Sequence, residues 1–426
     1  MTKKPDAPAI RFKGFSDAWE QRKLGELVDR VVRKNTNNES TLPLTISAQY
    51  GLVDQITYFN NRVASRDVSN YYLVLNGEFA YNKSTSDGYP FGAVKRLDLY
   101  EKGVLSTLYI VFSPKKEQQV DSDFLTVFFD TDRWHKGVAE RAAEGARNHG
   151  LLNISAEDFF DIDLSVPKDV AEQKKIGAFI RQLDNLITLH QRKFEKLTNV
   201  KKSMLEKMFP QNGCSYPEIR FKGFTDAWEQ RKLSEMCGTF EYGLNAAAKE
   251  FDGKNKYIRI TDIDDASREF LLSDLSSPDI CLDGMSKYLL SSGDIVFART
   301  GASVGKTYIY RENDGIVYFA GFLIRAKVNQ DNDAEFVFQS TLSPSYEKYI
   351  RITSQRSGQP GVNAQEYGEY DLFAPSKEEQ QRIGHFLRGI DNLITLHQRE
   401  LEKLQNIKKS MLEKMFVYGG TRKWES

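Results

Sequence analysis

The sequence is poor in the residues and runs that mark metal-binding, secreted and membrane proteins. Its three cysteines, Cys214, Cys237 and Cys281, do not have the spacing of metal ligands, and so small and odd a number is typical of reduced thiols in the cytosol. No run of about eighteen apolar residues could cross a membrane, and residues 1–15 lack the apolar core of a signal peptide. We therefore expect a cytoplasmic protein.

Catalytic motifs are also missing. The stretch GASVGKT at 301–307 has three residues between its glycines where a phosphate-binding loop needs four, and PFGAVKR in the first half lacks the pattern altogether. There is no GxSxG or HExxH motif, no cysteine–histidine cluster, and no glycine-rich loop with the Asn/Asp-Pro-Pro-aromatic tetrapeptide of a base methyltransferase. We expect a noncatalytic chain that itself holds no cofactor or metal.

The charge is balanced, with 59 basic and 59 acidic residues, which neither favours nor excludes nucleic acid until its distribution is known. A chain of 426 residues that is 40% hydrophobic and 12% aromatic is long enough for two to four globular domains.

The sequence does contain a double internal repeat. IRFKGFSDAWEQRKL at 10–24 recurs at 219–233 with one change, and residues 172–209 align without gaps to 379–416 with 28 identities in 38 positions. Both copies of the longer repeat include the nonapeptide DNLITLHQR. A period near 200 residues indicates duplicated domains rather than a solenoid.

The segments between the repeats are different from each other. Residues 25–167 and 234–375 hardly align, apart from short matches such as GEFAYNKS with GDIVFART. Similar ends indicate one task performed twice, whereas dissimilar middles indicate two different tasks.

Each long repeat predicts a helix of about 55–60 Å, at about 1.5 Å per residue. Its apolar residues recur at alternating intervals of three and four, the period of a coiled coil. We expect the two helices to pair antiparallel and to relate the halves by a pseudo-twofold axis; the alternative is that each packs on its own domain. The residues expected to pair the helices are Ile180, Leu183, Ile187, Phe194, Leu197, Leu387, Ile390, Ile394, Leu401 and Leu404.

Polar residues interrupt this apolar seam. We expect His190 and His397 to be a hydrogen-bonded mark of the helix register, rather than a metal site or pH switch, and Lys201 and Lys408 to extend their ammonium groups out to solvent.

The shorter repeat has a candidate helix start at Ser16 or Thr225. We expect its aromatic residues to anchor the entering chain to its domain, with partner binding as the alternative.

Four polar loops that contain glycine are candidates for reading DNA: residues 80–92 and 141–150 in the first half, and 297–306 and 351–361 in the second. Arg, Lys, Asn, Gln and Ser contact base edges, and glycine permits close approach. Two dissimilar modules at a fixed distance suit two half-sites, whose equivalent faces lie roughly 34–36 Å apart for one helical turn. Residues 25–166 hold 15 basic and 20 acidic residues, so a DNA surface there must be a local patch. The alternative is that these are ordinary surface loops.

In combination, these features resemble the specificity subunit of a type I restriction–modification system. The resemblance rests on the tandem halves, the repeated helix, the paired WEQRKL, GDIVFARTGASVGK, and the glycine just before an asparagine in GLLN at 150–153 and in GVN at 361–363, and it covers nearly the whole chain. It implies an α+β fold: two tandem α+β target recognition domains joined by two long helices in an antiparallel coiled coil. The expected division is 1–168 and 211–375 for the domains, 169–210 and 376–417 for the helices, and 418–426 for a tail.

The resemblance also implies partners. Each domain would read half of a bipartite target in double-stranded DNA, and the helices would set the spacer and dock two modification subunits that methylate adenine. Motor–nuclease restriction subunits would join for cleavage. S-adenosylmethionine, ATP and Mg²⁺ would then be bound by the partner subunits.

By position in the loops, the DNA contacts implied are Lys83, Ser84, Arg147, Asn148, Arg299, Thr300, Ser303, Lys306, Gln355 and Arg356. The first half has Asn82-Lys83-Ser84 in place of Arg-Thr-Gly, so the correspondence is looser there. A coiled-coil scaffold that binds two different polypeptides is the alternative from another class, and a stand-alone methyltransferase would have to bind S-adenosylmethionine.

Overall fold

A computed structural model describes residues 7–47, 50–86, 88–116, 120–142, 150–211, 213–355 and 358–417. The chain forms two compact units: unit 1 is Met1–Leu189 with Leu401–Ser426, and unit 2 is His190–Glu400. These units cut across the division expected from the sequence. Each takes the first half of its own long helix and the second half of the other one.

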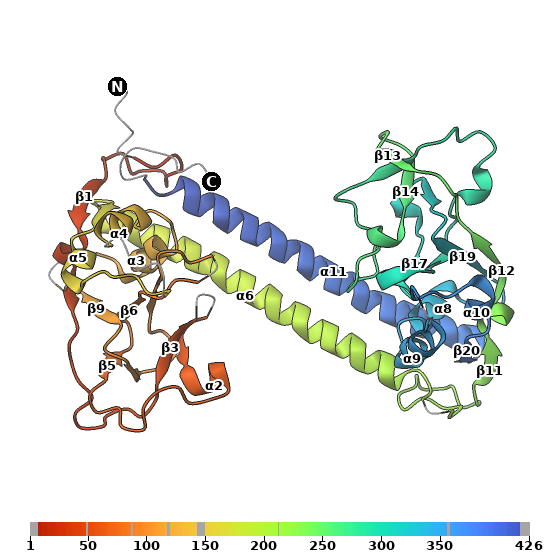
Figure 1. Ribbon diagram of the computed structural model, residues 1–426, viewed down its shortest axis with the longest axis horizontal. Helices are drawn as coiled ribbons and strands as arrows, with labels where there is room; N and C mark the ends of the chain where they lie inside the picture. Colours follow the sequence, from red (N-terminus) through yellow and green to blue (C-terminus); the bar gives the residue numbers. More distant parts are fainter. Residues whose placement is uncertain are drawn as a thin grey trace. The chain divides into compact units, whose positions relative to one another are not determined.

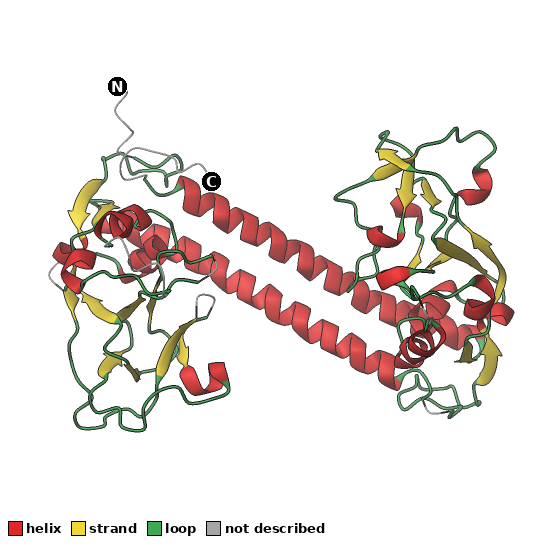
Figure 2. Cartoon of the chain, viewed as in Figure 1, coloured by secondary structure: helices red, strands yellow, loops and turns green. Residues whose placement is uncertain are grey.

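Unit 1 contains short strands and helices before its long helix (Figures 1 and 2). The strands are β1 Glu20–Lys23, β2 Val28–Arg30, β3 Leu44–Ser47, β4 Gly51–Asp54, β5 Tyr72–Leu75, β6 Phe79–Asn82, β7 Ala93–Arg96, β8 Lys102–Leu105, β9 Ile110–Pro114 and β10 Asp163–Val166. The helices are α1 Leu24–Leu27, α2 Gln55–Phe59, α3 Ser122–Phe129, α4 His135–Arg141, α5 Ala156–Phe160 and the long α6 Val170–Lys207, which continues into unit 2.

Unit 2 has a similar order of elements (Figure 1). Its strands are β11 Glu229–Lys232, β12 Cys237–Tyr242, β13 Ala248–Glu250, β14 Lys256–Ile258, β15 Ser276–Pro278, β16 Ile295–Ala298, β17 Thr307–Ile309, β18 Val317–Phe319, β19 Leu323–Val328 and β20 Asp371–Ala374. The α-helices are α7 Leu233–Met236, α8 Ala334–Ser340, α9 Pro344–Thr353, α10 Ala364–Gly368 and the long α11 Lys377–Lys414, which continues into unit 1. Short 3₁₀ helices are η2 Ile260–Asp262, η3 Ser286–Tyr288, η4 Gly301–Ser303 and η5 Glu312–Asp314.

Each unit has its own central sheet of four strands, and the two sheets have the same strand order although the sequences hardly align. Over the described residues, the order β2-β9-β6-β7 in unit 1 matches β12-β19-β16-β17 in unit 2, and all pairings in both sheets are antiparallel. Around these sheets lie two-stranded sheets, β3-β4 and β5-β8 in unit 1, and β13-β15 and the parallel β14-β18 in unit 2.

The shorter repeat joins each domain to its long helix. Its EQRK segment is a strand in both copies: Glu20 pairs with Val166, and Glu229 with Ala374. Each partner strand ends directly before a proline, Pro167 or Pro375. The helix start expected at Ser16 or Thr225 is wrong, because EQRK pairs as a strand and the chain before it turns at Gly14 and Gly223. These glycines have φ values of 101° and 105°, which right-handed helices exclude.

An arginine in the repeat holds the first turn of each long helix. Arg11 donates two hydrogen bonds to Glu172, at 2.6 and 2.7 Å, and Arg220 does the same to Glu379, at 2.7 and 2.8 Å. Both glutamates are 1% exposed, so the paired arginine stabilises a buried charge that would otherwise be costly. Of the aromatic residues expected to anchor the repeat, Trp19 and Trp228 are buried in the cores of units 1 and 2, as anchoring requires.

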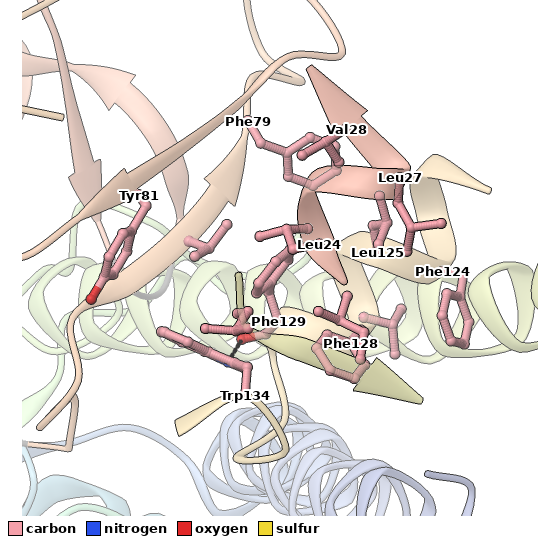
Figure 3. Close-up of a cluster of buried hydrophobic side chains, with 14 of the residues drawn as sticks. Leu24, Leu27, Val28, Phe79, Tyr81, Phe124, Leu125, Phe128, Phe129 and Trp134 are labelled. Carbon is pink, nitrogen blue, oxygen red and sulfur yellow. Dashed lines mark hydrogen bonds between the residues drawn. The ribbon is translucent and has the colours of Figure 1, made fainter. Parts of the chain in front are cut away.

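Aromatic side chains fill the core of unit 1 beneath β6 and around α3 (Figure 3). Trp134 donates a hydrogen bond from its indole nitrogen to the carbonyl of Phe129, at 3.1 Å. The C-terminal end of α11 completes this core, since Phe416 stacks on Phe124 with ring centroids 5.6 Å apart and also contacts Trp19.

The core of unit 2 is completed in the same way by the end of α6. Phe209 stacks on Phe336, with ring centroids 5.4 Å apart, and contacts Trp228. Each core therefore depends on the last residues of the helix that begins in the other unit.

This dependence predicts the effect of one truncation in each unit. Phe416→Ala should destabilise unit 1 by about 3–5 kcal/mol, because a buried aromatic ring is replaced by a cavity. Amide hydrogen exchange should then accelerate in α3 and stay unchanged in α8. Phe209→Ala is the matched control and should reverse the pattern; equal acceleration in both helices by either variant would contradict the separation of the two cores.

Candidate DNA-reading surfaces and the helix pair

The long helices α6 and α11 pair antiparallel, as expected. In unit 2, His190 contacts His397 and Lys201 contacts Asp391, so the partner number falls along α11 as the number rises along α6. In unit 1, Asp184 contacts Lys408. Intramolecular helix pairing is therefore confirmed.

Two ion pairs of the same kind join the helices. Lys201 lies 2.5 Å from Asp391 in unit 2, and Lys408 lies 2.7 Å from Asp184 in unit 1. The expectation that both lysines extend to solvent is wrong. The aspartate that begins each DNLITLHQR copy faces the lysine of the other helix, and an ion pair is more favourable for a largely covered ammonium group than partial exposure.

Each ion pair also connects the helices to the adjacent domain. Asp391 accepts a hydrogen bond from the Gln339 amide of α8, at 2.7 Å. Lys408 lies 3.6 Å from Asp130, which also accepts a hydrogen bond from Lys95 at 2.7 Å. Burial alone would lower the pKa of Lys408, but the carboxylates of Asp130 and Asp184 outweigh burial and raise the pKa above its usual value.

The two histidines make the expected polar contact. Their Nδ1 atoms are 3.0 Å apart, so one ring donates its Nδ1–H and the other accepts. Burial lowers the pKa of His397, and repulsion from His190 and Lys193 lowers it further. The contact needs one Nδ1 without a proton, so it is lost when both rings are protonated.

The apolar residues expected to pair the helices differ in burial. Early in each helix they are fully buried in the core of the adjacent unit: Ile180, Leu183, Leu387 and Ile390. Further along they are half-buried: Ile187, Phe194, Leu197, Ile394, Leu401 and Leu404. Both arrangements expected from the sequence therefore occur. The start of each long helix packs on its domain, and the polar contacts pair the two helices. The contribution of each apolar residue to pairing stays a prediction.

In unit 1 the structure brings the loop at 80–92 against residues 150–152, where the second expected loop ends; residues 143–149 of that loop lie outside the described residues. Leu152 N donates to the Lys83 carbonyl at 3.0 Å, and Thr85 N donates to the Gly150 carbonyl at 2.7 Å. Ser84 and Leu151 form the bridge between these contacts.

Unit 2 repeats the same three backbone contacts with different residues. Val362 N donates to the Arg299 carbonyl at 2.9 Å, Gly301 N donates to the Pro360 carbonyl at 3.0 Å, and Thr300 bridges to Gly361. In both units, the chain leaving β6 or β16 is therefore paired with the segment before α5 or α10. No sequence similarity between the halves predicts this shared geometry beyond the glycine just before an asparagine.

Buried tyrosines and close-packed glycines hold these loops. In unit 2, Tyr367 donates its hydroxyl to the Ala298 carbonyl at 2.6 Å and accepts from Gly305 N at 3.1 Å. Burial raises the pKa of Tyr367, so it stays a protonated donor. A Cβ on Gly305 would lie 2.6 Å from Ile350, and one on Gly92 in unit 1 would lie 2.1 Å from the Asn82 carbonyl. These loops are therefore held in one backbone shape.

The individual residues expected to contact DNA lie at different depths. Lys83, Arg299 and Thr300 are half-exposed, and Ser84 and Gln355 are exposed. Ser303 is only 9% exposed, which leaves its side chain little access to DNA. Arg147, Asn148 and Arg356 lie outside the described residues.

Two of the expected cations already have partners within the fold. Lys83 donates to the Ile154 carbonyl at 3.3 Å, and Lys306 pairs with Asp265. Arg299 instead lies over the ring of Tyr242, 5.1 Å from its centroid, a contact that the sequence did not indicate.

The described residues contain neither a candidate metal site nor a candidate membrane span. Within the ranges that the structure describes, no three His, Cys, Asp or Glu side chains are grouped so that they could hold a metal ion. Among those same residues, no helix is long and apolar enough to cross a membrane.

The fold defines a class of chain with two α+β domains in tandem. Each domain has loops at one end of a sheet of the same strand order, and each is followed by a long helix that pairs with the other long helix. The chain belongs to the type I restriction–modification DNA specificity family, because the model of the type I restriction modification DNA specificity domain matches residues 17–199 and again 225–406. Members of this family supply specificity and are not catalytic; catalysis lies in other subunits.

Known relatives agree with this assignment. The chain is 24% identical over 409 residues to the type I restriction enzyme MjaVIII specificity subunit of Methanocaldococcus jannaschii, covering 92% of this chain and 91% of that one. It is 26% identical over 217 residues to the putative MjaX specificity subunit of the same organism, covering 48% and 50%. The crystal structure of the type I S subunit from M. genitalium has the same fold, with a TM-score of 0.62, 14% identity, and coverage of 96% and 99%.

The histidine contact predicts a pH dependence in unit 2. Because the folded-state pKa of His397 lies below that of an unfolded histidine, about 6.5, stability should be constant above that pH and be lost as the pH falls through the folded-state pKa. The protection factors of residues 190–207, which correct for the intrinsic pH dependence of amide exchange, should therefore fall in acid. His397→Gln should flatten this dependence, whereas His385→Gln, at an exposed position of α11, should leave it as in the unchanged chain; an unchanged pH profile in His397→Gln would contradict the assignment.

Proposed function

We propose that this chain reads both halves of a bipartite DNA target and holds them at a set spacing, within a type I restriction–modification complex. The observation that carries the proposal is the same sheet edge in both units, built on matching backbone contacts but presenting different side chains. Identical geometry with different chemistry suits two recognition domains that meet two different sequences in the same manner. In this reading, Arg299 and Lys83 supply the cations at the centre of each surface.

The helix pair would set the spacer between the half-sites. Its support is the discrete register given by the Asp–Lys ion pairs and the histidine contact. Sliding one helix by a single turn would move each charged partner by about 5.4 Å and separate both ion pairs together. A spacer of defined length needs such an all-or-none register.

Two modification subunits would dock on the repeated segments of the helices. Support comes from exposed leucines that occupy the same repeat positions in both: Leu186 and Leu189 in unit 1, and Leu393 and Leu396 in unit 2. Exposed apolar side chains on a helix face suit a protein partner. Two identical copies of the face suit two copies of that partner. S-adenosylmethionine, ATP and Mg²⁺ would enter with the modification and restriction subunits, and the complex would act in the cytoplasm.

The exposed leucines also keep the scaffold alternative open. A chain that only joins two polypeptides would use the same helix face. DNA binding separates the alternatives, because phosphate contacts release counterions.

A domain exchange tests the modular reading. Replacing residues 25–166 with the corresponding segment of another family member should change one half of the methylated sequence and preserve the other half and the spacer, because the second unit and the helices are untouched. Sequencing of methylated adenines in cells that carry the exchanged chain measures this. Exchange of residues 234–374 is the matched control for the other half-site; a change in both halves from either exchange would refute independent reading.

A salt series tests DNA binding itself. The chain with its modification subunits should lose DNA affinity by about 10³-fold or more between 50 and 200 mM salt if six or more phosphates are contacted. Fluorescence anisotropy with a labelled target duplex measures the dissociation constants. A flat response, with the partner subunits still bound, favours the scaffold.

A further inference from the structure

In both units, exposed apolar side chains lie at one end of the strands of the central sheet. This is the end from which the loops expected to contact DNA leave β6 and β16. In unit 1 these are Val32, just after β2, and Leu108, just before β9, which are 56% and 64% exposed. In unit 2 they are Tyr242, at the end of β12, and Phe322, just before β19, which are 46% and 58% exposed. A single exposed apolar residue is ordinary, but a recurring pair at one edge requires a cause.

The strand registers show that these positions are equivalent. Arg30 and Phe79 both pair with Phe112 in unit 1, as Phe240 and Ile295 both pair with Ala326 in unit 2. Counting from these matched rows, Val32 corresponds to Tyr242, Leu108 to Phe322, and Lys83 to Arg299. The residue types differ at each position, yet all four uncharged positions are large and apolar. Folding does not require apolar residues here, because all four residues are between 46% and 64% exposed.

A cation accompanies the apolar pair in each unit. Arg299 N donates to the Phe322 carbonyl at 3.0 Å, and its guanidinium lies over Tyr242. In unit 1 the equivalent row carries Lys83. The surface thus combines a donor for guanine with an apolar face, and in the major groove the only apolar group on a base edge is the C5 methyl of thymine.

We propose that Leu108 in unit 1 and Phe322 in unit 2 each contact a thymine methyl in their half-site, with Val32 and Tyr242 beside them. This inference rests on the proposed DNA-reading function and adds a class of contact to it. Aliphatic and aromatic side chains both suit a methyl group, which explains why the residue type changes while apolar character persists. The contact contributes sequence discrimination without adding phosphate contacts.

Deoxyuridine is the probe, because it lacks only the methyl group of thymine. With the target identified from methylated adenines, each thymine of both half-sites is replaced in turn by deoxyuridine, and binding is measured with the full chain and its modification subunits. One replacement in each half-site should weaken binding about fourfold, the effect of losing one buried methyl-sized group.

Matched variants assign each effect to its residue. Leu108→Ala should abolish the methyl effect in the half-site read by unit 1 only, and Phe322→Ala in the other half-site only, whereas Phe322→Leu should retain it. Leu99→Ala and Ile316→Ala are controls, because both residues are exposed in connections that follow the far ends of β7 and β17. The slope of affinity against salt should be the same in all variants.

Three outcomes would overturn the inference: no thymine sensitive to methyl removal, an undiminished effect in Leu108→Ala and Phe322→Ala, or loss of the effect in the controls. If 2-aminopurine beside the site brightens on binding while methyl removal has no effect, the side chains act as wedges between base pairs instead. The proposed function is tested separately, since it fails only if the unchanged complex does not distinguish its target from random DNA.

Discussion

The reciprocal pairing of aspartate and lysine across the two long helices is the constraint on which the rest of the structure depends. Asp184 with Lys408 and Asp391 with Lys201 place charges of opposite sign in a largely covered seam. Displacing the helices would remove these ion pairs from Lys201, Asp391 and Lys408, whose side chains are only 13%, 20% and 21% exposed, and losing an ion pair is costly for a covered charge. Because both pairs arise from one repeated segment, a single sequence sets the register at two places. The contact between His190 and His397 is a third polar contact that would be lost if one helix slid along the other.

The two domains have the same backbone geometry but present different side chains. Both build the same four-stranded order, and in both the strand that leads to the reading loop is paired with the segment before a short helix. Small residues and buried tyrosines, including Gly92, Gly305 and Tyr367, keep the backbone in place. The side chains at the edge are then free to differ, so recognition can change without a change of fold.

Much of this arrangement could be predicted from the sequence because it is periodic or duplicated. Heptad spacing indicated the helices and their pairing, and the duplicated ends indicated two tandem domains. The Asp–Lys partners were missed because they lie about two hundred positions apart, where no local period connects them. The helix start assigned to Ser16 was wrong because capping preferences are local, whereas strand pairing with residues 163–166 decides that segment. The sheet order was not foreseen, since strands of three to six residues in unlike sequences leave little pattern. Loop residues were located by position alone, so Tyr242 beneath Arg299 and the burial of Ser303 became visible only in three dimensions.

Unit 1 is made of two segments that are far apart in the chain, and this affects how the chain folds during translation. Trp19, Phe124 and Phe128 are synthesised early, but Phe416, which covers them, is made only after the whole of unit 2. Unit 2 is continuous in the chain and has all of its core before that point. The usual order, in which the N-terminal domain matures first during translation, is therefore reversed: unit 1 keeps an open aromatic surface until Phe416 has been made, and a chain released before that residue carries the surface exposed.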